Sequence, residues 1–171
     1  MKRFAECAAD RVIFLRMPIP DLTAKGILPE GIHACTLDEV RAAFAGRESR
    51  TKREKLWNGF VRYLDVIRQT GVVDTIYLDG GFTSDSKNPN DIDAVLEIPI
   101  PVPPVSSVLM RKEFNHDYVK GEFQLDIFLW WNGFPSPAND LRMFFQYVKP
   151  KEAVNRGLKA GEKKGILKIA L

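Results

Sequence analysis

The chain has 171 residues and a mass of 19.4 kDa, enough for one compact domain and too little for two of ordinary size. Hydrophobic residues make up 45% and charged residues 27%, as in soluble globular proteins, and no apolar stretch reaches the roughly 20 residues that cross a bilayer. Two cysteines exclude a disulfide framework and a paired CxxC zinc site, and charged residues interrupt any signal-peptide core near the N-terminus. We therefore expect a cytoplasmic protein that makes no membrane contact.

The net charge of +3 conceals an uneven distribution. Residues 41–62 hold seven basic and two acidic side chains, residues 149–168 hold the same numbers, and residues 74–97 hold six acidic side chains and one lysine. An acidic centre between basic segments would suit a metal site that handles phosphates. The alternative is a set of solvated charged faces, for example at the helix start that carries Arg47, Arg50, Lys52 and Arg53.

Proline and glycine punctuate residues 1–35, which predicts an N-terminal arm containing a short strand or turn. Thr36 and Glu39 then have the spacing of a capping box, so a helix should begin here and end near Gly46. A longer helix is expected over residues 49–70, because apolar side chains recur there at spacings of three and four: Leu56, Phe60, Tyr63, Leu64 and Ile67.

The pattern then changes to that of β-strands. β-Branched and aromatic residues predict strands over residues 72–78, 92–98 and 122–131. Alternate prolines at 98–104 remove the donors of a strand ladder, so this segment should leave the sheet.

A helix around residues 139–147 and a last strand over residues 165–171 complete the expected elements. Helices followed by a mixed β-sheet indicate an α+β (α/β) fold in which the sheet packs against helices. We expect one domain over residues 1–171, with a core at 72–131 and a basic C-terminal segment at 149–171.

One segment, LDGGFTSDSKNPNDIDAV (residues 78–95), carries the chemistry. Gly80 and Gly81 would let the backbone turn tightly and bring its N–H groups to a phosphate, which a Cβ atom would obstruct. Asp91 and Asp93 are two residues apart on a strand, so their carboxylates project from one face. Such carboxylates repel each other unless a cation lies between them, and hard oxygen ligands suit Mg²⁺ or Mn²⁺.

A third carboxylate, Asp126, interrupts an otherwise apolar strand and should share a face with Gln124 and Phe128. Burying it alone would be unfavourable, so it needs a partner or a metal. If its strand lies beside that of Asp91 and Asp93, three aspartates converge, as a two-metal phosphoryl-transfer site requires.

Together these residues resemble the signature of the polymerase-β-type nucleotidyltransferase superfamily: Gly80-Gly81, nine intervening residues, Asp91-Ile92-Asp93 and a later strand with Asp126. The likeness covers residues 78–130. The segments around 28–33 and 164–166 also resemble a bacterial family of small, poorly characterised proteins with this core.

The resemblance implies a nucleotide held at its phosphates by Gly80 and Gly81, with Thr83 and Ser84 of the same loop also binding the nucleotide. It also implies magnesium on Asp91, Asp93 and Asp126, with Asp126 as the base for an acceptor hydroxyl. Many active members carry serine where this chain has Gly81, so one hydroxyl contact to phosphate is missing.

The leading interpretation is a magnesium-dependent nucleotidyltransferase that moves a nucleoside monophosphate from ATP or another NTP to a hydroxyl of a protein, an RNA end or a small molecule. A protein acceptor would fit antitoxin-like members that modify a toxin. The alternatives are a catalytically inactive module that binds a toxin or nucleic acid and a nuclease that uses the same carboxylates. Asp79 is expected to be a turn residue, His33 structural and His116 a surface residue of a connector.

Overall fold

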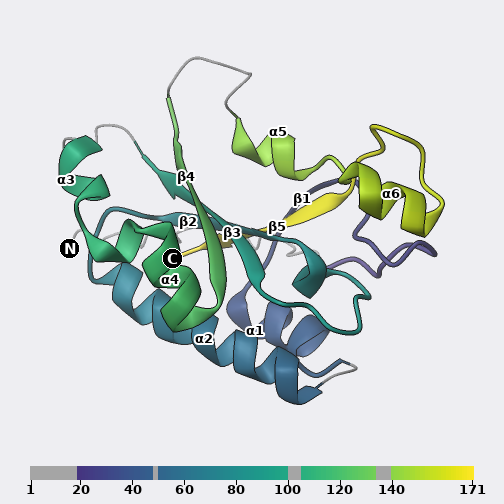
Figure 1. Cartoon of the computed structure of the whole chain (residues 1–171), viewed down its shortest axis with the longest axis horizontal. Coiled ribbons are helices and arrows are strands. Elements are labelled where there is room, and N and C mark those ends of the chain that lie inside the picture. The colour runs from purple at the N-terminus through teal and green to yellow at the C-terminus, as the bar shows by residue number, and fades with distance from the viewer. Residues whose placement is uncertain (1–18, 48–49, 100–104, 134–139) are drawn as a thin grey trace, which may run out of the picture.

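The computed structural model describes residues 19–47, 50–99, 105–133 and 140–171. In this part of the chain, a mixed five-stranded sheet has the order β1-β5-β2-β3-β4 and carries helices on both faces (Figure 1). The predicted α+β architecture is confirmed. The start of the expected arm and most of the proline-rich segment after the second predicted strand lie outside the described residues.

The strands of the sheet are β1 (Gly31–Ala34), β2 (Thr75–Asp79), β3 (Ile92–Ile98), β4 (Leu125–Trp131) and β5 (Gly165–Ala170). β1 pairs with β5 and β3 with β4 in parallel, whereas β2 is antiparallel to both of its neighbours, β3 and β5. β1 belongs to the segment expected to form an arm, and His33 there has the structural role expected of it, since its Nε2 lies 2.8 Å from the Pro29 carbonyl oxygen.

The two N-terminal helices follow the expected pattern. α1 (Leu37–Val40) begins with the predicted capping box, in which the Thr36 hydroxyl accepts from the Glu39 amide at 3.1 Å and the Glu39 carboxylate accepts from the Thr36 amide at 2.6 Å. A π-helical turn over Arg41–Ala45 extends it. α2 (Arg50–Arg68) buries the whole apolar stripe that its sequence predicts.

The region between β3 and β4 differs from the prediction. It holds α3 (Val105–Leu109) and α4 (His116–Phe123), and α4 replaces the start of the strand expected from residue 122. The Asn115 side chain caps α4, and Gln124 ends it in the left-handed conformation with φ 59°. A helix of eight residues shows little periodicity, and tertiary packing of its buried residues Val119 and Phe123 stabilises it.

The C-terminal part adds α5 (Leu141–Phe145), shorter than expected, and α6 (Pro150–Arg156), which was not anticipated. α5 lies on the sheet face opposite α2 (Figure 1). No helix in the described ranges combines the length and apolar character that a membrane crossing needs.

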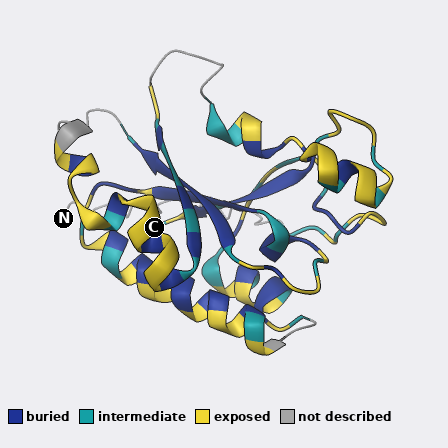
Figure 2. Cartoon of the chain, viewed as in Figure 1, coloured by how far each residue is buried: buried dark blue, intermediate teal, exposed yellow. Residues whose placement is uncertain are grey.

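The sheet therefore has two unlike faces, and its central strands β2 and β3 are buried along their whole length (Figure 2). The face toward α2 contributes to a large hydrophobic core with α1 and α4. The opposite face contributes to a small core, made of Tyr77, Val95, Trp130, Phe145 and Ile166. Because side chains alternate along a strand, Asp79, Asp93 and Asp126 all fall on this second face.

Candidate functional site

Strand register brings two of the predicted aspartates side by side. Asp93 on β3 is paired with Asp126 on the parallel strand β4 and with Asp79 on the antiparallel strand β2. Residues in register on neighbouring strands point to the same face. The expectation that Asp126 lies on the face of Asp93, beside it, is therefore confirmed.

The charges of this cluster act on Asp93, whose side chain is almost fully buried. Burial raises the pKa of Asp93 to about 6, and the negative charges of Asp79, Asp91 and Asp126 add to this effect while Lys149 opposes it. A carboxyl group that is buried, has a raised pKa and lies beside other carboxylates is a candidate functional group.

A lysine connects the other two predicted aspartates. Lys120 Nζ on α4 lies 2.9 Å from Asp126 Oδ2 and 3.3 Å from Asp91 Oδ2. His116 Nε2, one turn earlier, contacts Asp126 Oδ1. Burial raises the pKa of Asp126, but hydrogen bonds from Lys120 and His116 outweigh it, so the net shift is downward.

The interpretation of His116 as a surface residue in a connector is thus wrong in part, because it begins α4 and its ring reaches Asp126. Periodicity does not predict α4, which has eight residues, so the sequence pattern does not reveal the position of His116. Sequence reasoning did not single out Lys120 either. It lies four residues after His116, and this spacing places both side chains on one side of α4.

Asp79 is more than the turn residue expected from its position. Its carboxylate forms a buried ion pair with Lys164, whose Nζ lies 2.7 Å from Oδ1 and 2.9 Å from Oδ2. Burial raises the pKa of Asp79 in spite of this partner. The pair ties β2 to the basic C-terminal segment beside Asp93.

The two glycines after β2 have different reasons to be glycine. Gly80 has φ 85°, and a Cβ atom there would lie 1.8 Å from Asp93 Oδ2, so both conformation and space exclude a side chain. The atoms nearest to a Cβ atom at Gly81 would belong to Ser86 and Pro89, at 3.5–3.6 Å, which is ordinary contact. The structure therefore leaves room for a serine at Gly81.

Thr83 and Ser84 are buried, and their hydroxyls serve the loop itself. Thr83 Oγ1 donates to the Gly80 carbonyl at 3.3 Å, and Ser84 Oγ donates to the Gly81 carbonyl at 3.0 Å. These two residues, predicted to bind the nucleotide, thus shape the backbone of the loop.

Basic residues approach this loop from two sides. Arg53 of α2 is 1% exposed, so the interpretation of its cluster as a solvated helix start is wrong for Arg53. Lys52 Nζ donates to Asn90 Oδ1 at 2.9 Å. From the C-terminal segment, Arg156 of α6 donates to Asp85 at 2.7 Å. The two basic segments, residues 41–62 and 149–168, are far apart in the sequence, and both contribute side chains that contact the acidic segment at residues 74–97.

As a metal site, this cluster has suitable donor atoms but no preformed geometry. Within the described ranges, no three His, Cys, Asp or Glu side chains are already arranged to hold a metal ion. The donors of Asp91, Asp93 and Asp126 are hard carboxylate oxygens, which Mg²⁺ prefers. Since the Lys120 ammonium bridges Asp91 and Asp126, a cation already lies between these carboxylates.

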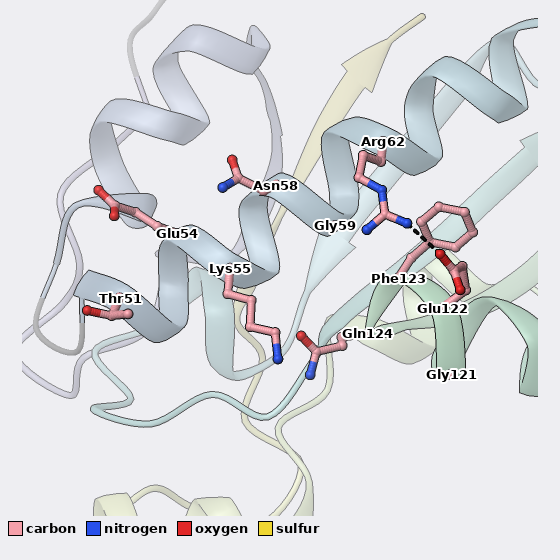
Figure 3. A pocket seen from close by; sticks show the side chains of 10 residues that line it. All are labelled: Thr51, Glu54, Lys55, Asn58, Gly59, Arg62, Gly121, Glu122, Phe123 and Gln124. Carbon is pink, nitrogen blue, oxygen red and sulfur yellow. Dashed lines mark hydrogen bonds and ion pairs between the residues drawn. The ribbon is translucent and has the colours of Figure 1, made fainter.

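A separate cavity of about 520 Å³ lies between α2 and the turn from α4 into β4. Lys55 and Gln124 point toward each other across it, and Arg62 pairs with Glu122 at its far end at 2.5 Å (Figure 3). None of the predicted site residues lines this cavity, although Gln124 comes two residues before Asp126. The carboxylates and the loop after β2, residues 80–86 (the glycine loop), therefore remain the candidate site.

Comparison with the curated proteins gives no match, and comparison with the solved structures gives none. A family model matches residues 20–170, which include all the strands and the candidate site. The chain therefore belongs to DUF6932, a family of unknown function.

Proposed function

We propose that this protein is a magnesium-dependent nucleotidyltransferase that moves a nucleoside monophosphate from ATP or another NTP to a hydroxyl acceptor. The observation that carries the proposal is the register of Asp93 with Asp126, next to the turn at Gly80. This arrangement concentrates carboxylates beside a backbone that can approach phosphates closely.

In this proposal Asp91, Asp93 and Asp126 hold the metal. Bound Mg²⁺ would act as a Lewis acid toward the triphosphate and the acceptor oxygen. The raised pKa of Asp93, caused by burial and by neighbouring carboxylates, supports a cationic ligand here, because a cation would relieve the repulsion.

The remaining roles belong to side chains and backbone of the chain. The backbone at Gly80 and Gly81 binds the phosphates, and the buried Thr83 and Ser84 hydroxyls keep the loop in shape. The Asp126 carboxylate takes the proton of the acceptor hydroxyl. The acceptor oxygen then bonds to the α-phosphorus while the bond to pyrophosphate breaks.

The first experiment is calorimetric titration of the purified protein with a non-hydrolysable ATP analogue, with and without Mg²⁺. We expect binding that depends on Mg²⁺ and that falls at least about tenfold in Asp91→Asn/Asp93→Asn, since the charge that holds the metal is removed. The control is Asp65→Asn, which neutralises an exposed carboxylate on α2.

The second experiment incubates the protein with α-labelled ATP, Mg²⁺ and protein, RNA or small-molecule acceptors. Label should appear on one acceptor class with the wild type and with Asp65→Asn, but not with the double variant. Transfer by the double variant at the wild-type rate would contradict the proposed site.

One observation favours a second candidate, a non-catalytic binding module. The Lys120 ammonium, which bridges Asp91 and Asp126, could be the permanent counter-ion of these carboxylates. A module of this kind would bind the ATP analogue equally well, or not at all, with and without Mg²⁺. The calorimetric titration therefore separates the two candidates.

A further inference from the structure

The residue that holds the glycine loop in place is Arg53, one turn into α2. Its guanidinium donates to the carbonyl of Phe44 at 3.3 Å and to four carbonyls of the loop. The loop acceptors are Phe82 at 2.7 Å, Ser86 at 2.6 Å, Ser84 at 3.1 Å and Gly81 at 3.4 Å.

The positive charge of Arg53 is buried among backbone carbonyl oxygens. No ion pair joins it to any residue that the structure describes, and its Nε is buried with no hydrogen-bond partner there. The acid that acts on it, Asp85, pairs with Arg156 at 2.7 Å. Carbonyl oxygens and the Phe82 ring, 5.4 Å from the guanidinium carbon, surround this cation without neutralising its charge. Burying an unneutralised charge is unfavourable, and a bound anion would offset it.

The hydrogen bonds of Arg53 also orient the loop. In a trans peptide the carbonyl and the following N–H point in opposite directions. Because the carbonyls of Gly81 and Phe82 point to the guanidinium, the amides of Phe82 and Thr83 point away from it. The N–H groups of Phe82 and Thr83, which are the positive ends of these peptide dipoles, therefore face the side of the loop opposite Arg53.

We propose that Arg53 is a positioning residue that makes the 81–86 loop a binding site for a polyphosphate anion. It presents the amides of the loop and adds a buried positive charge behind them. The inference deepens the proposed function, since it rests on the phosphate-binding role of this loop. It differs from a purely structural role, in which Arg53 joins α2 to the loop and anion affinity is unaffected.

The test is titration of the protein with inorganic tripolyphosphate in the absence of Mg²⁺, followed by calorimetry. We expect the affinity of Arg53→Met to fall at least about tenfold, and that of Arg53→Lys to fall less because the charge remains. The matched control is Tyr63→Phe, which removes another buried hydrogen bond of α2, from the Tyr63 hydroxyl to the Glu113 carbonyl at 2.9 Å. Its tripolyphosphate affinity should equal that of the wild type.

A second measurement covers the case in which the Arg53 variants do not fold. In the wild-type chain, tripolyphosphate should shift the amide NMR signals of Phe82 and Thr83 and leave that of Tyr63 unchanged. Unchanged signals at Phe82 and Thr83, or equal affinity in folded Arg53→Met, would overturn the inference. Anion binding that depends on Arg53 without any nucleotidyl transfer would uphold it and reject the proposed function.

Discussion

The two faces of the sheet carry buried side chains of different chemistry on the same strands. On β2 and β3, the face toward α2 carries Ile76, Leu78, Ala94 and Leu96, all in the large hydrophobic core. The other face carries Thr75, Tyr77 and Asp79 on β2 and Asp93, Val95 and Glu97 on β3, and these are buried too. Burial therefore does not distinguish the faces, whereas the chemistry of the buried groups does.

The polar face shows how a small fold keeps carboxylates out of water. Glu97 accepts from the Tyr77 hydroxyl at 2.6 Å and from Asn132 at 2.5 Å, and Asp79 pairs with Lys164. Asp93 forms no ion pair with another described residue, and its pKa is raised. The apolar face stabilises the fold, and the polar face carries an electrostatic strain that a ligand could relieve.

The largest expected effect is on the apolar face. Phe60→Ala should lower the free energy of unfolding by about 4 kcal/mol, because Phe60 is 0% exposed and its loss leaves a cavity in the main core. Phe145→Ala on the other face should be milder, since its small cluster can relax. Denaturant unfolding of both variants measures the difference, and equal losses would contradict the contrast between the faces.

Breaking the buried ion pair should come next. Lys164→Met leaves the Asp79 carboxylate buried without its cation, and we expect a loss of about 3 kcal/mol. Without Lys164 the pKa of Asp79 should rise further, so the loss should shrink toward low pH, where the carboxyl is protonated. Lys164→Met/Asp79→Asn should recover most of the stability in the same unfolding experiment; failure to do so would assign the effect to packing.

Neutralising the strained carboxylate should have the opposite sign. Because the pKa of Asp93 rises from 3.8 to about 6 on folding, its ionised form destabilises the protein above that pH. Asp93→Asn should therefore stabilise the metal-free protein by about 2 kcal/mol at pH 8. This gain should fade between pH 6 and pH 4, as the wild-type carboxyl takes up a proton.

The matched variant for this measurement is Asp126→Asn. It should destabilise the protein at neutral pH, because the pKa of Asp126 is lowered by Lys120 and His116 in spite of burial. Thermal unfolding across this pH range checks both variants. A loss of stability in both at pH 8 would show that Asp93 is not under electrostatic strain.

The smallest effect is expected at position 81 of the glycine loop. Gly81→Ser should change the free energy of unfolding by less than about 0.5 kcal/mol, because a Cβ atom fits there. If the loop binds phosphates, the added hydroxyl should tighten binding of the ATP analogue a few-fold. Gly80→Ser is the contrasting variant, and its clash with Asp93 should lower stability strongly.

Part of this arrangement follows from local patterns in the sequence. The capping box at Thr36, the apolar stripe of α2 and the strand around Asp93 depend on short-range periodicity, so they could be predicted. α4 could not, since it is short and depends on burial of Val119 and Phe123. Because His116 and Lys120 lie on α4, their contacts with Asp126 could not be predicted either.

The sequence alone shows two adjacent glycines, two aspartates two residues apart and a third aspartate in a later apolar segment, although Asp91 lies just before β3 and not on it as expected. The tertiary structure decided which charges meet, because strand register places Asp126 beside Asp93, and long-range packing brings Lys164 to Asp79 and Arg53 to the glycine loop. Periodicity is a property of neighbouring residues, whereas the partner of a buried charge comes from wherever the fold closes around it.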